Sequence, residues 1–175
     1  CMADLMALSS ISMMRADVRR DGALRPDLLQ ALRDLAPPFI RWPGGSFAST
    51  YRWKDGIGSY VSRRYHPNMM WGGYSDYYGF GTDEFLTLCR KLGSEPLIVL
   101  AAPSTDPDAV QYAMDWVHYL NDPPTTELGR LRAANGHAEP YGVRCFQIDN
   151  EPMNNGFTPE KYAEVVNLYG SRLRA

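Results

Sequence analysis

A run of mostly apolar residues at 143–148 ends abruptly in the polar pair Asn150 and Glu151, followed by Pro152. The run has the character of a buried strand, and the carboxyl ends of parallel strands are where α/β enzymes carry catalytic groups. A carboxyl group buried there would have a raised pKa suited to general acid catalysis. Glu151 is therefore the first candidate catalytic residue. The alternative is a solvated or salt-bridged glutamate after a strand.

The two residues before Glu151 have different expected roles. Asn150 can hydrogen-bond a sugar hydroxyl, in particular the 2-hydroxyl, whose contacts strengthen in the transition state of glycoside cleavage; otherwise it is an asparagine tolerated in a turn. Asp149 lies on the same strand end and cannot face the opposite side of a sugar, so we expect a structural or supporting carboxylate. Hydrolysis of a glycosidic bond with retention of configuration needs two carboxyl groups about 5–5.5 Å apart. This strand end supplies only one of them.

A second candidate strand end, about a hundred residues earlier, reads Arg-Trp-Pro-Gly-Gly-Ser at residues 41–46. The glycine pair lets the backbone approach a ligand, and Ser46 adds a hydroxyl, so Gly45 and Ser46 are candidate substrate-binding residues. A purely structural tight turn is the alternative.

The segment 43–81 that contains the glycine pair holds ten of the 21 Phe, Trp and Tyr residues and eight of the 15 glycines. A βα loop of this length is expected to be functional. Trp71 within it can stack on a sugar ring, although packing is the commoner use of one aromatic residue.

Composition and charge narrow the class of protein. The chain has 175 residues, of which 45% are hydrophobic and 22% are charged, as in ordinary globular domains. Eighteen basic and twenty acidic residues give a net charge of -2, which provides no electrostatic footprint for nucleic acid or an anionic membrane. No span reaches the roughly 20 apolar residues of a membrane helix. A neutral substrate suits this balance, and neither nucleic acid nor membrane is an expected partner.

Several kinds of site have no support in the sequence. The histidines are far apart and lack metal-site spacing: His66, His118 and His137. There is no GxSxG elbow and no Walker loop, so we expect no metal, no cofactor, and neither acyl nor phosphoryl transfer. The cysteines form no CxxC pair and are expected to be buried or inert thiols: Cys1, Cys89 and Cys145.

Hydrophobic periodicity predicts helices and strands in strict alternation. Leu28, Leu32 and Leu35 form a helical stripe behind Pro26, and the later helices show the same pattern. The expected order is a helix from Pro26, a strand at 39–42, a helix capped by Thr82 and ended by Gly93, a strand at 96–101, a helix capped by Asp106, a strand at 143–148 and a helix capped by Thr158. This order calls for parallel strands joined by helical crossovers.

An open doubly wound sheet and a (β/α)8 barrel share this order. No GxGxxG follows a strand into a helix, which disfavours the dinucleotide-binding open sheet. A closed barrel needs about 250 residues, so we expect an α/β fragment of a (β/α)8 TIM barrel, roughly helix 1 to helix 4. The predicted organisation is an N-terminal segment of unclear structure at 1–21 and a partial catalytic domain at 22–175. The segment 2–14 is a poor signal peptide, and a cytoplasmic location is slightly favoured.

Four motifs in order carry a resemblance to a known family: residues 41–47, 51–58, 80–85 and 148–151. Together they resemble glycoside hydrolase family 51, the α-L-arabinofuranosidases, from about residue 22 to the C-terminus. The resemblance implies a retaining barrel enzyme that releases terminal α-L-arabinofuranosyl units from arabinose-containing oligo- and polysaccharides. Glu151 then takes the acid/base position after strand four, with Asn150 on the substrate and Trp71 on the leaving-group side.

The same resemblance implies that part of the site lies elsewhere. The family's nucleophilic glutamate comes from strand seven, and a substrate-binding glutamate of its first strand precedes the matched region. We therefore expect an inactive fragment of the catalytic domain, and a homo-oligomer for the full-length enzyme. Two residues depart from the family pattern: Ser46, where the family commonly has Asn and sometimes Cys, and Asp149, where Gly commonly precedes the Asn-Glu pair. The alternatives are another retaining glycosidase of the same clan, such as a xylosidase or endoglucanase, and a non-catalytic carbohydrate-binding half-barrel.

Overall fold

The computed structural model describes residues 13, 15–20 and 24–174. Residues 1–36 and 37–175 form two compact units. The first contains helices α1 (Ala16–Arg20) and α2 (Pro26–Leu35). Most of the N-terminal segment predicted at 1–21, Cys1 included, lies outside the described residues, and the boundary predicted after residue 21 stays a prediction.

Helix α2 begins at Pro26 as predicted, but its buried side differs from the prediction. Leu28 and Leu35 are 54% and 72% exposed, whereas Leu29 is buried. The buried line of the helix therefore runs through Leu29 and the half-buried Leu32. Periodicity identified the helix correctly and placed its apolar stripe about one residue away, because four leucines in eight positions fit more than one line along a helix.

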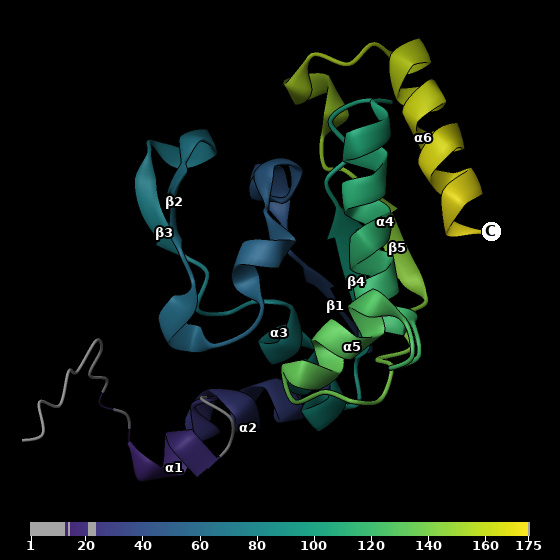
Figure 1. Ribbon diagram of the computed structural model, residues 1–175. Coiled ribbons are helices and arrows are strands. Elements are labelled where there is room, and N and C mark those ends of the chain that lie inside the picture. Colours follow the sequence, from purple (N-terminus) through teal and green to yellow (C-terminus); the bar gives the residue numbers. More distant parts are fainter. Residues whose placement is uncertain (1–12, 14, 21–23, 175) are drawn as a thin grey trace, which may run out of the picture. The chain divides into compact units, whose positions relative to one another are not determined.

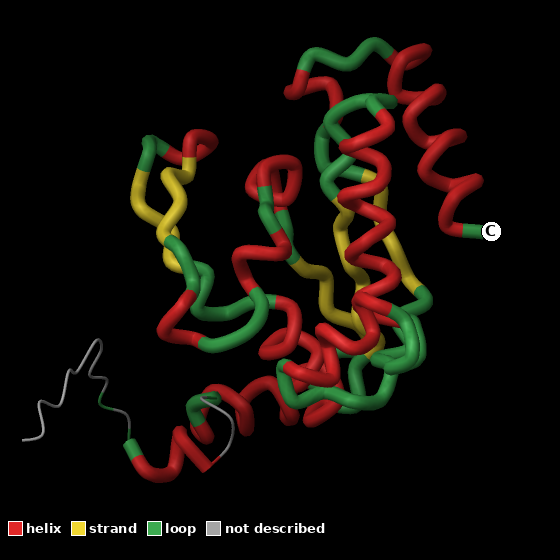
Figure 2. The backbone as a smooth tube through the Cα atoms, viewed as in Figure 1, coloured by secondary structure: helices red, strands yellow, loops and turns green. Residues whose placement is uncertain are grey.

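Three parallel strands form the main sheet of the second unit, in the order β1-β4-β5 (Figures 1 and 2). They are β1 (Phe39–Trp42), β4 (Glu95–Leu100) and β5 (Cys145–Ile148). The parallel pairing expected from the sequence is confirmed. Strand β4 lies one residue earlier than predicted, and β5 begins two residues late because the backbone of Val143 pairs instead with the side-chain amide of Asn121.

Helices α3 (Thr82–Leu92), α4 (Pro107–Asn121) and α6 (Pro159–Leu173) share one apolar cluster with a single face of this sheet. The strand side chains in the cluster alternate along each strand: Ile40, Trp42, Ile98, Leu100, Phe146 and Ile148. A doubly wound sheet carries helices on both faces. The one-sided cover seen in the described residues fits the sheet of a barrel instead.

The opposite face of the sheet carries Arg41 and Gln147, whose side chains are hydrogen-bonded to each other. Cys145 also lies on this face and is exposed, so of the two alternatives predicted for the cysteines, buried or inert, burial does not hold for it: strand alternation turns it away from the helices. Cys89 on α3 is buried as predicted, and burial raises the pKa of its thiol to about 11. This shift keeps the Cys89 thiol protonated and inert at neutral pH.

The helix caps agree with the sequence in two of three cases. Asp106 and Thr158 accept hydrogen bonds from the first turns of α4 and α6 as predicted. Helix α3 instead has Gly81 at its N-cap, and the Glu84 carboxylate accepts the Gly81 N–H at 2.9 Å. Thr82 lies inside the helix because its hydroxyl accepts the indole N–H of Trp116 at 3.1 Å.

Helix α5 (Glu127–Ala134) follows α4 and was not predicted, since its apolar residues form no clear helical stripe. The fully buried guanidinium of Arg132 secures it by donating to four backbone carbonyls: those of Tyr119, Asp122, His137 and Ala138. No helix in the described ranges is both long and apolar enough to cross a membrane.

The long segment 43–81 has a structure of its own. It contains four short 3-10 helices and an antiparallel hairpin: η1 (Gly45–Thr50), η2 (Trp53–Gly56), η3 (Tyr60–Ser62), β2 (Tyr65–Asn68), η4 (Met69–Trp71) and β3 (Tyr74–Tyr77). Figure 1 shows this hairpin to the left of the main sheet. The sequence placed the segment as one βα loop but did not reveal the hairpin, which consists of two strands of only four residues.

Arg63 anchors this loop to helix α3. Its buried guanidinium makes two hydrogen bonds to the Glu84 carboxylate, at 2.7 and 2.9 Å. It also donates to the backbone carbonyls of Gly58, Tyr78 and Gly79. The planar fork of arginine suits this geometry, so one side chain holds both ends of the hairpin region against the helix.

Replacing Arg63 with Lys should destabilise the protein, because an ammonium group cannot reproduce the fork to Glu84 and still reach the three carbonyls. Breaking a buried pair costs about 3–5 kcal/mol, and the partial exposure of Glu84 lowers our expectation to about 2–3 kcal/mol. Urea unfolding of the purified protein measures this loss. The exposed neighbour provides the control: Arg64→Lys should stay within about 0.5 kcal/mol, and equal losses in both variants would contradict the anchoring role.

Asp83, in the first turn of α3, is a buried carboxylate that accepts hydroxyl hydrogen bonds from Tyr119 at 3.0 Å and Tyr141 at 2.8 Å. Burial raises the pKa of Asp83 above its usual range, against the opposing effect of these hydrogen bonds. A raised folded-state pKa means that the group's contribution to stability is complete below the ordinary aspartate pKa and is lost as the pH rises through the raised value.

The Asp83→Asn variant should therefore gain stability relative to the wild type as the pH increases. Melting temperatures of both proteins at about pH 4 and about pH 7 test this: the variant minus wild-type difference should become more positive at the higher pH. A difference that does not change with pH would show that the Asp83 carboxyl titrates alike in the folded and unfolded states.

Candidate active site

Glu151 and Ser46 meet at the carboxyl ends of β5 and β1. The Ser46 hydroxyl lies 3.5 Å from Oε2 of Glu151, and the Asn154 side-chain amide donates to the same oxygen at 3.1 Å. Gly45 precedes Ser46 with a φ of 63°, a left-handed conformation that glycine adopts at little cost. Two segments that the sequence singled out separately are thus brought together by the fold.

Glu151 has an unusual backbone. Its φ of 46° and ψ of 56° are left-handed, although it is neither glycine nor asparagine and directly precedes Pro152, the first residue of η5 (Pro152–Asn155). Such a conformation costs on the order of 1–3 kcal/mol and persists only where the surroundings impose it, most often at functional sites. Glu151 is exposed, so the burial predicted for it is wrong for this chain.

Asn150 is buried, and its side-chain amide has a fixed orientation. Its Oδ1 accepts a hydrogen bond from Nη2 of Arg41 at 2.6 Å, while the Arg41 Nε donates to Oε1 of Gln147 at 2.8 Å. Within the described part of the chain, Nδ2 of Asn150 is buried and has no hydrogen-bond partner. The acceptor is occupied and the donor is free, so Asn150 is set to donate to a ligand.

Asp149 directly follows strand β5 and precedes Asn150 and Glu151 in the chain. It is 1% exposed. Its carboxylate accepts hydrogen bonds from the Ser49 hydroxyl at 2.5 Å, the backbone N–H of Asn150 at 2.6 Å and the backbone N–H of Ala102 at 3.2 Å. Its side chain thus points into the protein, away from solvent. These contacts fit the structural or supporting role expected from the sequence.

Trp71 is not brought to the other candidates. It is 61% exposed at the turn of the β2–β3 hairpin. Among the contacts of the described residues, none joins Trp71 to Ser46, Asn150 or Glu151. The structure therefore assembles Gly45, Ser46, Asn150 and Glu151 at one edge of the sheet and leaves the placement of Trp71 on the leaving-group side as a prediction.

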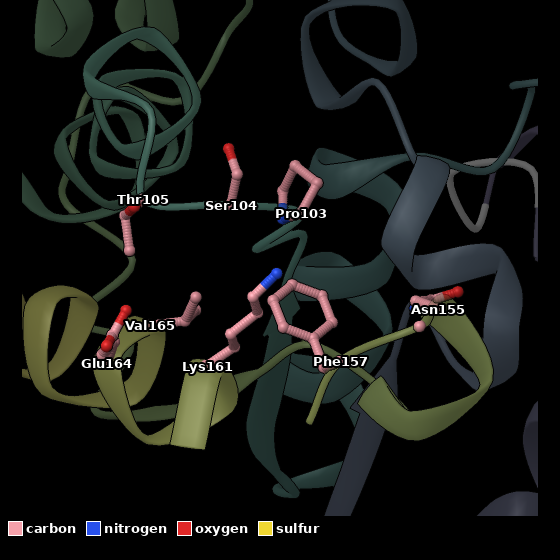
Figure 3. Close-up of a pocket in the computed structure, with 9 residues that line it drawn as sticks. Pro103, Ser104, Thr105, Asn155, Phe157, Lys161, Glu164 and Val165 are labelled. Atoms are coloured by element: carbon pink, nitrogen blue, oxygen red, sulfur yellow. The ribbon is translucent and has the colours of Figure 1, made fainter. Parts of the chain in front are cut away.

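A pocket of about 360 Å³ adjoins this edge (Figure 3). Its walls are the loop after β4, at Pro103–Thr105, and the segment that leads from η5 into α6. The Lys161 side chain points into the space beside the Phe157 ring in Figure 3. Glu151 does not line this pocket, but Asn155 does, and its amide donates to the Ser49 hydroxyl at 3.0 Å. The pocket is a neighbour of the candidate acid, whose own surroundings are open to solvent.

Two features of this site were missed in the sequence. Arg41 and Gln147 had no assigned role, although a charged and an amide side chain alternating with apolar neighbours in short strands indicate a polar face. The link from Ser49 to Asp149 joins residues about a hundred positions apart and has no sequence signal. In the described ranges, no group of three or more His, Cys, Asp or Glu side chains is placed to hold a metal ion. This arrangement can support proton transfer at the Glu151 carboxyl group, next to the free amide donor of Asn150.

Comparisons with known proteins identify the family of this chain. Residues 31–174 match the family described as the alpha-L-arabinofuranosidase 1 domain. An intracellular exo-alpha-L-arabinofuranosidase of Bacteroides ovatus is 34% identical over 161 residues, which is 91% of this chain and 31% of the relative. Alpha-L-arabinofuranosidase C of Emericella nidulans is 40% identical over 158 residues, 88% of this chain and 31% of the relative.

A solved structure of similar sequence has the same fold. The thermostable GH51 α-L-arabinofuranosidase from Thermotoga petrophila superposes with a TM-score of 0.80 at 33% identity, covering 87% of this chain and 32% of the other. The chain spans about a third of the length of the curated relatives it matches. The match extends over most of the sequence. It includes the three-stranded parallel sheet, the helices on one face of that sheet and the Asn-Glu pair at a strand end. The chain belongs to glycoside hydrolase family 51, the α-L-arabinofuranosidases.

Proposed function

We propose that the protein containing this chain is a retaining glycoside hydrolase that releases terminal α-L-arabinofuranosyl residues from arabinose-containing oligo- and polysaccharides. One observation carries the proposal: Glu151 is held in a strained conformation at a parallel strand end, beside an asparagine whose amide donor is free. The names of the family's members support the choice of arabinofuranosides.

Glu151 acts first as the general acid and then as the base. In the first step its proton passes to the glycosidic oxygen as that oxygen leaves; in the second, its carboxylate accepts a proton from the water that attacks the sugar. Asn150 donates to the sugar 2-hydroxyl, an interaction that strengthens in the transition state. Ser46 and the backbone at Gly45 contact the substrate next to Glu151, and Trp71 lies on the leaving-group side.

The second carboxyl group of a retaining mechanism must lie about 5–5.5 Å from the first. Asp149 cannot supply it, because its oxygens are occupied by Ser49, Ala102 and the Asn150 amide. We propose that β1, β4 and β5 are the second, third and fourth strands of a barrel, that the nucleophile comes from residues beyond these 175, and that this chain alone is inactive. Homo-oligomeric assembly of the full-length enzyme stays a prediction.

Replacing Glu151 with Gln in the full-length enzyme should abolish proton transfer while leaving substrate binding intact. We expect kcat on an arabino-oligosaccharide to fall by about 10²–10⁴. An aryl arabinofuranoside with a good leaving group should lose much less in the glycosylation step, because its departing oxygen needs little protonation. The control is Glu160→Gln, an exposed glutamate in the first turn of α6 that should leave turnover unchanged. Unchanged turnover in Glu151→Gln would refute the assignment.

Asn150→Ala should remove the hydrogen bond to the sugar 2-hydroxyl. With an aryl arabinofuranoside, kcat/KM should drop by about 100-fold, as for the loss of one transition-state donor in other enzymes. With the matching 2-deoxy substrate, which lacks that hydroxyl, wild type and variant should differ by only a few-fold. This cycle of variant and substrate isolates the pairwise interaction, and equal losses on both substrates would place Asn150 away from the 2-hydroxyl.

A further inference from the structure

Asp149 occupies a backbone position that would ordinarily suit glycine. Its φ is 57°, in the left-handed region where a glycine carries no steric cost and aspartate is tolerated. The side chain is nevertheless almost completely buried, at 1% exposure. A buried carboxylate is unfavourable unless hydrogen bonds satisfy it, so the presence of Asp149 in place of a smaller residue needs an explanation in its contacts.

The contacts of Asp149 join the carboxyl ends of all three parallel strands. Ser49 belongs to η1, which follows β1; Ala102 follows β4; and the Asn150 backbone follows β5. Ser49 also accepts a hydrogen bond from the Asn155 amide, so η5 is tied into the same cluster. One carboxylate therefore links the segments that carry Ser46, Asn150 and Glu151.

We propose that Asp149 is a positioning residue for the hydrolysis described above: its carboxylate clamps the three strand ends and thereby sets the direction of Asn150 and Glu151. The proposal rests on the proposed function, because it concerns the acid and the hydrogen-bond donor of that reaction. Asp149 does not touch the substrate or the reacting atoms. Its effect reaches them through the peptide between Asp149 and Asn150, whose N–H it binds, and through the left-handed turn that delivers Glu151.

Substitutions of the Asp149 side chain can distinguish this positioning role from a simple requirement for a left-handed backbone at that position. Glycine would satisfy the left-handed φ but would leave the N–H groups of Ala102 and Asn150 and the Ser49 hydroxyl without their acceptor. Asparagine would keep one acceptor oxygen and present an N–H₂ group to one of the donors. If only the backbone mattered, Asp149→Gly would be harmless or beneficial. If the clamp matters, Asp149→Gly is the more damaging change, and Asp149→Asn lies between it and the wild type.

The test uses the full-length enzyme and two substrates that differ in their need for protonation. An arabino-oligosaccharide depends on proton delivery by Glu151, and an aryl arabinofuranoside with a good leaving group depends on it little. The readout is the ratio of kcat/KM on the oligosaccharide to kcat/KM on the aryl substrate for Asp149→Gly, Asp149→Asn and Ser49→Ala. A loss of folded protein lowers both values equally and leaves the ratio unchanged, so the ratio reports on the placement of the acid.

We expect the ratio to fall by about tenfold or more in Asp149→Gly, since small displacements of a catalytic group cost large factors in rate. Smaller falls should follow in Asp149→Asn and Ser49→Ala. Asp83→Asn, a buried aspartate outside the site, is the matched control and should keep the wild-type ratio. If Asp149→Gly does not fold, as judged by its melting curve, Asp149→Asn and Ser49→Ala decide the question by the same ratio.

Two results would overturn the inference in distinguishable ways. An unchanged ratio in the folded Asp149 and Ser49 variants of an active enzyme overturns the clamp alone and leaves the proposed function standing. A wild-type enzyme that hydrolyses neither arabinofuranoside overturns the proposed function and the inference with it.

Discussion

Parallel pairing of β1, β4 and β5 is the constraint on which the rest of this structure depends. Because the three strands run in the same direction, their carboxyl ends meet at one edge of the sheet, although the segments lie up to about a hundred residues apart in the chain. Parallel pairing thus brings Ser46 and Glu151 to the same edge, where the Ser46 hydroxyl lies 3.5 Å from Oε2 of Glu151. Side-chain alternation adds a second condition, since it directs apolar residues to the helices and leaves Arg41 and Gln147 on the other face.

Hydrogen bonds at this edge of the sheet fix the orientation of the side chains that lie there. Arg41 occupies the acceptor of Asn150 and so determines which end of the amide is free. The Asp149 carboxylate binds the backbone N–H groups that follow the central strand β4 and the strand β5, and the backbone is left-handed at both Asp149 and Glu151. The local strain at Glu151 is compatible with a stable fold because the buried Asp149 carboxylate accepts hydrogen bonds from Ser49, Ala102 and the Asn150 backbone beside it.

The long segment between β1 and α3 illustrates how a loop of this size can be ordered. Its aromatic residues pack partly into the core, as Trp53 and Tyr78 do, and partly remain exposed, as Trp71 does. Arg63 joins the segment to helix α3 through a bidentate contact to Glu84. Glu84 also accepts the N–H of the helix cap, so the start of the helix and the anchoring of the loop depend on the same carboxylate.

By itself the sequence determined the three strands of the main sheet, their parallel direction, the helices α2, α3, α4 and α6, and the Asn-Glu pair at a strand end, because periodicity and turn residues act over a few neighbouring positions. It did not reveal helix α5 or the β2–β3 hairpin. It also indicated the family through motifs in order. Only the tertiary structure decided that Glu151 is exposed, that Asn150 offers its donor, that Asp149 joins three strand ends, and that Trp71 stands apart from them. Those outcomes depend on contacts between residues that are distant in the chain. Residue types alone do not determine which of these contacts form, because the contacts exist only once the strands lie side by side.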